Sequence, residues 1–307
     1  MGRRRAPVDG LEPIRERDRP WRTHVVRVRT LKFLEMKQQG ERIPTVTAYD
    51  YPTARIADEI GIPLLLVGDS LGNVVLGHDS TVHVTLDDIL HHTKAVVRGS
   101  SKAMVVADMP FMTFQVSPEE ALRNAGRLLQ EGGAQAVKVE GGHRTAETVH
   151  RLAQAGIPVM GHLGLTPQSV NQFGGYRVQG RSYEEAARLI EDAKELEQAG
   201  AFSIVLETIP VELARIVTRE LRIPTIGIGA GPYCDGEVQV LYEMLGLITA
   251  RPRKHAKLFA DLNATIRAAL TAYVDEVRAR QFPTLDHGHQ LEPDVLERLQ
   301  RHYRSRH

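Results

Sequence analysis

Short apolar runs alternate with longer segments of helical periodicity along most of the chain. The runs are rich in Val, Ile and Leu and predict strands at residues 43–50, 63–69, 103–108, 136–141, 158–164, 202–207 and 224–230, with a shorter eighth within 237–244. Between them, apolar residues spaced three and four apart predict helices near 52–60, 86–98, 118–131, 145–155, 183–199 and 211–220. This alternation predicts parallel strands joined by helical crossovers.

A closed (β/α)8 barrel, the α/β fold known as the TIM barrel, and an open doubly wound sheet both satisfy this pattern. The number of βα units favours the barrel. The segment TLKFLEMKQQGE (30–41) would then close the bottom of the barrel, and residues 255–281 would supply the closing helices. We therefore expect three parts: a flexible charged extension over 1–28, a catalytic barrel over 29–282, and a tail over 283–307 with an amphipathic helix around 292–304.

Polar residues recur where the predicted strands end. The acids that close an apolar run are Asp50, Asp69, Asp108, Glu140 and Glu207, and His162 lies near the end of another run. Parallel strands bring their carboxyl ends to one rim, which is where such folds carry their chemistry. Any one acid could instead cap the next helix, and Asp50 and Asp69 are candidates for that role. Helix capping is a weaker explanation for Asp108, because its helix begins only near Pro118.

The stretch AVKVEGG (136–142) sharpens this expectation. Lys138 and Glu140 lie two residues apart, so on a strand both point to one face while Val137 and Val139 point to the other. An outer strand could turn the charged face to solvent, but a strand covered by helices has no solvated face. Lys138 would then be buried and would need an anionic partner, either a neighbouring acid or a substrate carboxylate.

Composition narrows the class of partner. The chain has 307 residues and a net charge of +1, an ordinary globular balance that gives no reason to expect nucleic acid or a membrane as partner. The single cysteine, Cys234, excludes an internal disulfide framework and fits a cytoplasmic location. Several carboxylates on a dry rim would repel one another without a cation, and oxygen ligands without a Cys/His cluster favour Mg²⁺. A bidentate 2-oxo acid could complete the coordination shell of that ion.

Seven segments together resemble one family. TAYDYPTARIAD, LLLVGDSLGNVVLGHDST, VVADMPFMTF, VKVEGG, GHLGLTPQSVNQFGGYRVQGR, VLETIPVELA and IGIGAG occur in the order and spacing of the ketopantoate hydroxymethyltransferases, from about Thr30 to about His287. The resemblance implies a (β/α)8 barrel of the phosphoenolpyruvate mutase/isocitrate lyase superfamily type. It also implies Mg²⁺, 5,10-methylenetetrahydrofolate as one-carbon donor, 3-methyl-2-oxobutanoate as acceptor, and a homo-oligomer that is usually a decamer of five dimers.

The resemblance also implies roles for individual residues. Asp69 and Asp108 would bind the metal directly, and Glu140 would act on it through water. The substrate-binding residues would be Asp69, Ser70, Asp108, Lys138 and His162. Glu207 would be the base that removes the C3 proton. The chain departs from the family pattern mainly around its eighth strand, where Glu237 follows Asp235-Gly236 in place of the usual Gln, and in the tail.

Two other functions fit the sequence. One is another Mg²⁺-dependent enolate enzyme of the same superfamily, such as a carbon–carbon lyase, although Cys234 is not in the type of loop that carries the lyase cysteine. The other is a non-catalytic scaffold, although a scaffold would be expected to lose the acids at the strand ends.

Overall fold

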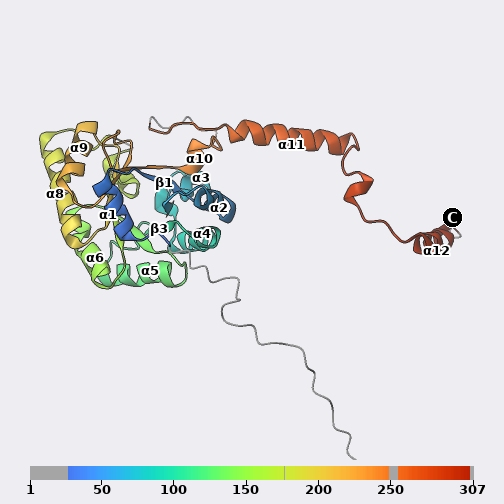
Figure 1. The fold of residues 1–307 in the computed structure, drawn as a ribbon, viewed down its shortest axis with the longest axis horizontal. Coiled ribbons are helices and arrows are strands. Elements are labelled where there is room, and N and C mark those ends of the chain that lie inside the picture. The colour runs from blue at the N-terminus through green and yellow to red at the C-terminus, as the bar shows by residue number, and fades with distance from the viewer. Residues whose placement is uncertain (1–26, 176, 249–254, 305–307) are drawn as a thin grey trace, which may run out of the picture. The chain divides into compact units, whose positions relative to one another are not determined.

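The computed structural model describes residues 27–175, 177–248 and 255–304, so the predicted N-terminal extension lies almost wholly outside the described residues. Eight parallel strands close into a barrel in chain order (Figure 1). The strands are β1 (Ile43–Thr47), β2 (Leu64–Val67), β3 (Met104–Asp108), β4 (Ala136–Glu140), β5 (Val159–Gly164), β6 (Ser203–Glu207), β7 (Thr225–Ile228) and β8 (Gly236–Gln239). Closure is complete because β8 pairs with both β7 and β1. The predicted (β/α)8 barrel is confirmed, and the open sheet is excluded.

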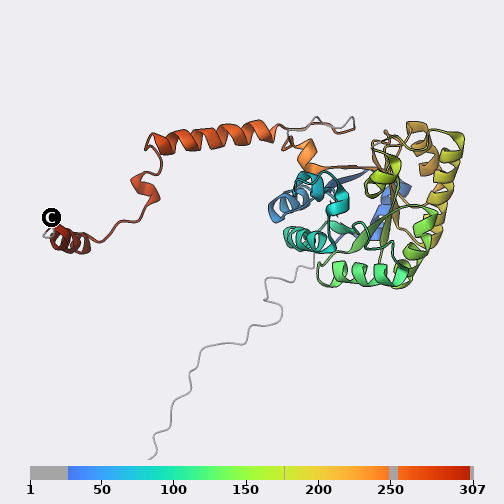
Figure 2. The same cartoon turned by 180° about the vertical axis from the view of Figure 1, so that it is seen from behind.

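Helices fill the crossovers and ring the strands (Figures 1 and 2). The helices of the barrel unit are α1 (Thr30–Gln39), α2 (Tyr51–Glu59), α3 (Leu71–Val74), α4 (Leu86–Gly99), α5 (Pro118–Gln130), α6 (His143–Gln154), α7 (Val170–Phe173), α8 (Tyr183–Ala199) and α9 (Val211–Glu220). Two starts follow their sequence patterns closely. Ser117 caps α5 with Pro118 in its first turn, and the Asp50 carboxylate caps α2 by accepting from the Thr53 amide. The capping role considered for Asp50 is therefore confirmed.

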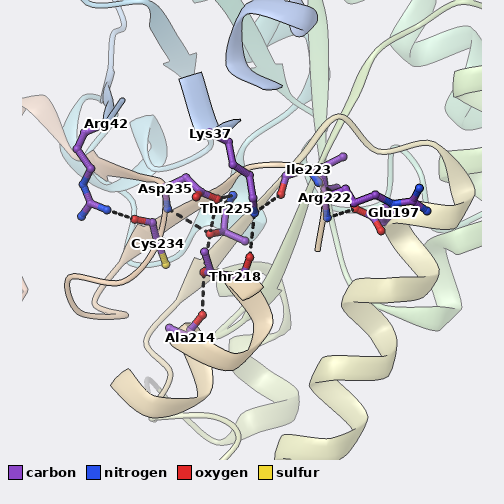
Figure 3. Close-up of polar contacts among 10 residues, drawn as sticks. All are labelled: Lys37, Arg42, Glu197, Ala214, Thr218, Arg222, Ile223, Thr225, Cys234 and Asp235. Atoms are coloured by element: carbon purple, nitrogen blue, oxygen red, sulfur yellow. Dashed lines mark hydrogen bonds and ion pairs between the residues drawn. The ribbon is translucent and has the colours of Figure 1, made fainter. Parts of the chain in front are cut away.

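The bottom of the barrel is closed by α1, as the sequence predicts. Phe33 and Met36 of this helix belong to the buried core formed by the inward side chains of the strands. Lys37 of the same helix donates to the carbonyls of Thr218 and Ile223 at 2.9 Å and forms an ion pair with Asp235 at 3.0 Å (Figure 3). This apolar contact with a charged anchor fixes α1 at the end of the barrel opposite to the strand carboxyl ends.

Residues 242–307 form a second compact unit. The helices α11 (Leu262–Arg278) and α12 (Pro293–Arg304) and the short 3₁₀ turn η4 (Leu285–His287) lie in it, and the one-turn helix α10 (Leu241–Met244) begins at its boundary. The amphipathic tail helix is confirmed as α12. No side chain of α11 is buried, so its expected role in closing the barrel stays a prediction, as do the domain boundaries at 28 and 282. Among the described residues, no helix has the length and apolarity needed to cross a membrane.

Candidate active site at the strand carboxyl ends

The inward positions of the barrel change from apolar to charged along the strands. In β4, Ala136 belongs to the lower core, and Lys138 and Glu140 continue the same inward face. The inward side chains of three other strands change in the same way, from Val106 to Asp108 in β3, from Met160 to His162 in β5 and from Val205 to Glu207 in β6. The six predicted site residues that gather there are between 2% and 6% exposed: Asp69, Asp108, Lys138, Glu140, His162 and Glu207. The predicted rim cluster exists, and its members are buried.

Lys138 lies at the centre of this cluster. Its Nζ is 3.1 Å from Asp108 Oδ1, 3.1 Å from His162 Nδ1 and 3.7 Å from Glu140 Oε1. Strand register explains the first contact, because Asp108 pairs directly with Lys138 across β3 and β4. Although burial alone would lower the pKa of Lys138, Asp108, Glu140 and Asp69 together raise it above its ordinary value. Lys138 is therefore a fixed cation, and the interpretation of AVKVEGG as an inward charged pair is confirmed.

His162 connects two acids from different strands. Its Nδ1 is 3.2 Å from Glu140 Oε1, its register partner on β4, and its Nε2 is 3.2 Å from Glu207 Oε2 on β6. Burial and Lys138 disfavour a second positive charge, but Glu140 and Glu207 outweigh them and raise the pKa of His162 to about 9. The two acids therefore favour the protonated form of the ring, and each ring nitrogen faces one carboxylate.

Asp69 and Asp108 carry the unfavourable electrostatics of the site. Burial raises the pKa of Asp69 well above its ordinary value, and the charges of Asp108 and Glu140 raise it further. Burial likewise raises the pKa of Asp108, although Lys138 opposes the shift. Asp108 Oδ2 accepts from the backbone amide of Asp69 at 2.9 Å. Four carboxylates thus share two cationic side chains, Lys138 and His162, and Asp69 is the least compensated of the four.

Ser70 stands beside the acids on the β2 side. Its hydroxyl is 2.8 Å from the Tyr49 hydroxyl, which links the ends of β1 and β2. Gly68, two residues before Ser70, is at an inward position, where a Cβ would come 2.9 Å from Ser70 Oγ and 3.5 Å from Asp108 Oδ2. A side chain at Gly68 would fill the space in which these oxygens converge. The structure thus places Ser70 with the other predicted site residues, at the edge of the acid cluster.

Gln168 is a site residue to which the sequence pattern assigns no role. It is buried in the 3₁₀ turn η3 (Pro167–Ser169) after β5, and its Nε2 donates to Asp69 Oδ2 at 2.9 Å and to the Met109 carbonyl at 3.0 Å. Its backbone amide donates to Glu140 Oε2 at 3.1 Å. One residue therefore holds acids from two strands. A neutral amide after a proline turn carries no charge pattern, so only the three-dimensional contacts reveal it.

Gln168→Leu is expected to destabilise the protein by about 1–3 kcal/mol, because Asp69 Oδ2 and the Met109 carbonyl lose their buried donor while the side-chain volume is nearly kept. Chemical denaturation measures the change. Gln172→Leu, at an exposed position of the short helix α7 that follows η3, is the matched control and should stay within about 0.5 kcal/mol of the parent. Equal stability of both variants would contradict the role given to Gln168.

The backbone after Glu207 is held in an uncommon conformation. Thr208 has a φ of +51°, which is disfavoured for a β-branched residue. Its amide donates to the Ile228 carbonyl at 2.9 Å, and its carbonyl accepts from the Gln179 amide at 3.1 Å. These bonds from two other segments hold the strained residue in place. Strain of this kind next to a buried acid is a common feature of functional sites.

The donor set fits a hard divalent cation. The buried Oδ1 of Asp108 and Oε1 of Glu140 lack a hydrogen bond of good geometry, although Lys138 lies within ion-pair distance of both. Within the described part of the chain, no three acidic, His or Cys side chains already form a complete metal-binding group. Mg²⁺ does not require one, since it often binds through one or two carboxylates with water and substrate oxygens. A cation beside Asp69 would also relieve the repulsion described above.

Comparison with known proteins matches most of the chain to a single family. A family model described as ketopantoate hydroxymethyltransferase matches residues 27–285. A 3-methyl-2-oxobutanoate hydroxymethyltransferase of Dehalococcoides mccartyi is 61% identical over 87% of this chain and 95% of its own length. A protein of the same name from Chloroflexus aurantiacus is 58% identical over 88% of this chain and 96% of its own.

Several solved structures share the fold of this chain. 2,3-Dimethylmalate lyase, a member of the phosphoenolpyruvate mutase/isocitrate lyase superfamily, matches with a TM-score of 0.53 at 20% identity, over 88% of this chain and 93% of that one. Phosphonopyruvate hydrolase in complex with oxalate and Mg²⁺ matches with a TM-score of 0.56 at 12% identity, over 90% and 96%. At such identities the likeness concerns the barrel alone.

Proposed function

Because this chain belongs to the ketopantoate hydroxymethyltransferase family and thus catalyses the hydroxymethyl transfer of pantothenate biosynthesis, we propose that the acid cluster at the strand carboxyl ends is where it does so. The acceptor is 3-methyl-2-oxobutanoate, the donor is 5,10-methylenetetrahydrofolate, and the products are 2-dehydropantoate and tetrahydrofolate. The observation that carries the proposal is the juxtaposition of Lys138, His162 and Glu207 with the Asp69–Asp108 pair in one buried group.

Asp69 and Asp108 would hold Mg²⁺ directly, and Glu140 would act on it through water. When bound there, Mg²⁺ supplies Lewis acidity to the keto oxygen of the acceptor and neutralises the charge that develops on it. The uncompensated charge of Asp69 and the raised pKa values of both aspartates support this assignment, because a cation would favour the ionised carboxylates.

Lys138 and His162 would hold the oxo acid, with Ser70 at its edge. Lys138 is kept protonated by the surrounding acids, so it can bind the substrate carboxylate without first gaining a proton. Its present partner, Asp108, lies 3.1 Å away and would be released to its role as ligand when the substrate carboxylate takes that place. Binding of the acceptor thus exchanges one anionic partner of Lys138 for another and leaves no buried charge unpaired.

Glu207 would remove the C3 proton. It ends β6 between the buried side chains of Leu206 and Ile209, so its carboxylate is shielded from bulk water. His162 Nε2 lies 3.2 Å from Glu207 Oε2, within ion-pair distance, and so keeps the carboxylate beside a ring nitrogen. The resulting enolate carbon forms the new carbon–carbon bond with the one-carbon unit, whose two bonds to the folate nitrogens are broken in the course of the transfer. Water supplies the hydroxyl group of the product, and tetrahydrofolate leaves with two protons on these nitrogens, one from C3 of the acceptor and one from water.

The two other functions are disfavoured by specific observations. Cys234 lies two residues before β8, next to Asp235, which pairs with Lys37 of α1 (Figure 3). This is the end of the barrel that α1 closes, opposite to the acid cluster. A catalytic cysteine of a lyase would have to stand at the other end. A scaffold has no use for buried acids whose pKa values are raised, because such groups lower stability.

The decisive test measures tetrahydrofolate formed by the full-length protein from 3-methyl-2-oxobutanoate and 5,10-methylenetetrahydrofolate. Turnover is expected with Mg²⁺ and is expected to stop when EDTA is added. Turnover that is indifferent to EDTA would contradict the metal assignment. No turnover with this acceptor, but cleavage of a 2-hydroxy acid under the same conditions, would favour the lyase instead.

A homo-oligomer, a decamer by resemblance to the family, and a cytoplasmic location complete the proposal. Apolar side chains repeat along α11 at three- and four-residue spacing and are 38% to 59% exposed: Ile266, Leu270, Tyr273, Val274 and Val277. A stripe of this kind supports burial in an assembly. The single cysteine, which precludes an intramolecular disulfide, supports the cytoplasm.

A further inference from the structure

A cavity adjoins the acid cluster. It lies between the ends of β4 and β5 and the first turns of α6 and α8, and its volume is about 490 Å³. That size is typical of a site for an organic ligand and is larger than a five-carbon acid requires. Its inner end is formed by Glu140, Leu163, Gly164 and Gln168, and Arg144 and Arg188 stand at its exposed outer side.

We propose that this cavity binds the folate co-substrate, with its one-carbon end at Glu140 and Gly164 and its glutamate tail along Arg144 and Arg188. The inference rests on the proposed function, since it assigns a place to the donor of that reaction.

Proximity to the proposed base is the first argument. Gly164 pairs in register with Glu207, and a Cβ on Gly164 would lie 2.2 Å from the Glu207 carbonyl oxygen. Glu140, on the other side of the inner end, lies within 3.2 Å of His162. A one-carbon donor seated in the cavity therefore has its reactive end at Gly164, beside the backbone of Glu207, and at Glu140, whose partner His162 also faces the Glu207 carboxylate.

The glycines that end β4 keep the cavity open. Gly141 has a φ of +121°, which a side chain would disfavour. A Cβ on Gly142 would come 2.2 Å from the Asp192 carboxylate, so only glycine lets the start of α6 approach α8 this closely. The pair Gly141-Gly142, at the end of AVKVEGG, thus shapes one wall of the cavity.

The inner lining suits an aromatic heterocycle with a hydrogen-bonding edge. The amides of Gln115, Gln168 and Gln172 line the cavity, and Gln115 Nε2 already donates to Gln168 Oε1 at 3.2 Å. The ring of Phe111, 37% exposed, borders the same space. Amides can match the donors and acceptors of a pterin, and a phenyl ring can stack against it or against the aminobenzoyl group.

The charges of the outer side suit a carboxylate tail. Asp192 accepts from the His143 amide at 3.0 Å and lies 3.1 Å from its ring Nδ1, and Glu185 accepts from the amides of Arg181 and Ser182. Both acids are thus engaged locally. Arg144 and Arg188 form no ion pair with any acid in the described part of the chain. Two unpaired guanidinium groups on the path from the cavity to solvent favour an anionic ligand segment.

The test compares folate binding by the wild-type protein, the double variant R144Q/R188Q and the control variant R151Q, whose arginine is exposed on α6 but lies outside the cavity. Calorimetry measures the Kd of tetrahydrofolate triglutamate and of the monoglutamate without turnover. We expect the double variant to weaken triglutamate binding by roughly twofold to thirtyfold, as for the loss of two exposed ion pairs, and to weaken monoglutamate binding less. R151Q should match the wild type.

A second variant tests the inner end. Phe111→Ala should raise the Kd of both folates by at least about threefold, whatever the tail length. Unchanged Kd values in both R144Q/R188Q and Phe111→Ala would overturn the assignment, as would equal losses for the two tail lengths in the double variant. Solvent deuterium exchange at C3 of the oxo acid requires no folate, so it reports separately whether the proposed transfer chemistry itself fails.

Discussion

Glu207→Gln is expected to lower the rate of solvent deuterium exchange at C3 of 3-methyl-2-oxobutanoate by about 100-fold to 10,000-fold, the range typical for loss of a positioned base. Glutamine keeps the size of the side chain, and its amide oxygen can occupy the position of Glu207 Oε2, 3.2 Å from His162 Nε2. The geometry of the site should therefore persist while the basic oxygen is lost. Proton NMR in D₂O, with Mg²⁺ present and folate absent, measures the exchange directly.

The controls for this prediction separate chemistry from binding. Glu212→Gln removes an exposed carboxylate from the first turn of α9, five residues farther along the chain, and should exchange at the wild-type rate. Mg²⁺ and oxo-acid affinities of Glu207→Gln should stay within about threefold of the wild type, because Asp69, Asp108 and Lys138 are unchanged. Exchange in Glu207→Gln at the wild-type rate would remove Glu207 from the base role, whatever the binding data show.

The sequence predicted the barrel and most of the charged cluster for a single physical reason. Side chains alternate along strands, and the carboxyl ends of parallel strands meet, so Lys138 and Glu140 could be placed on one inward face with Asp108, His162 and Glu207 nearby. Predicted strand ends were less accurate. The apolar run predicts a first strand that reaches residue 50, whereas β1 ends at Thr47, because the apolar residues Ala48 and Tyr49 continue past the strand toward the rim.

Other features depend on contacts that no local pattern encodes. Gln168 reaches Asp69 across 99 positions in the chain, and the bond requires the β5 loop to fold over the mouth of the barrel. The pairing of His162 with both Glu140 and Glu207 depends on the ring rotamer as well as on register. Asp69 could have been a helix cap by sequence alone; in the structure α3 has no side-chain cap, and the Asp69 carboxylate turns to Gln168 instead.

Asp69→Asn is expected to have opposite effects on stability and on activity. In the metal-free protein, burial and the charges of Asp108 and Glu140 raise the pKa of Asp69 above its unfolded value. A carboxyl group whose pKa is raised on folding lowers the stability of the protein at pH values above its unfolded pKa. This loss of stability disappears as the pH falls below the unfolded pKa. The neutral amide should therefore make the apo protein more stable at pH 7 by about 1 kcal/mol. That gain should shrink as pH falls toward the ordinary value of 3.8.

Addition of Mg²⁺ should reverse the order of stability. At 100 times its Kd, a ligand that binds only the folded state stabilises it by about 2.7 kcal/mol, so the wild type should overtake the variant. Asp69→Asn should gain far less and should lose turnover by at least about 100-fold, since the proposed ligand is gone. Urea denaturation with EDTA and with Mg²⁺ measures both states, and Asp87→Asn, which removes only an exposed pair with Arg127, is the control.

A reversal in the order of stability of the wild type and Asp69→Asn when Mg²⁺ replaces EDTA distinguishes a metal-binding acid from a structural one. If Asp69 served mainly to hold Gln168, replacing it would destabilise the protein equally with and without Mg²⁺, because the 2.9 Å bond to Gln168 Nε2 would be weakened in both cases. If it is a ligand kept in an unfavourable setting, the apo protein gains and the Mg²⁺-bound protein loses. A variant less stable than the wild type under both conditions, by the same amount, would therefore contradict the assignment of Asp69 to the metal.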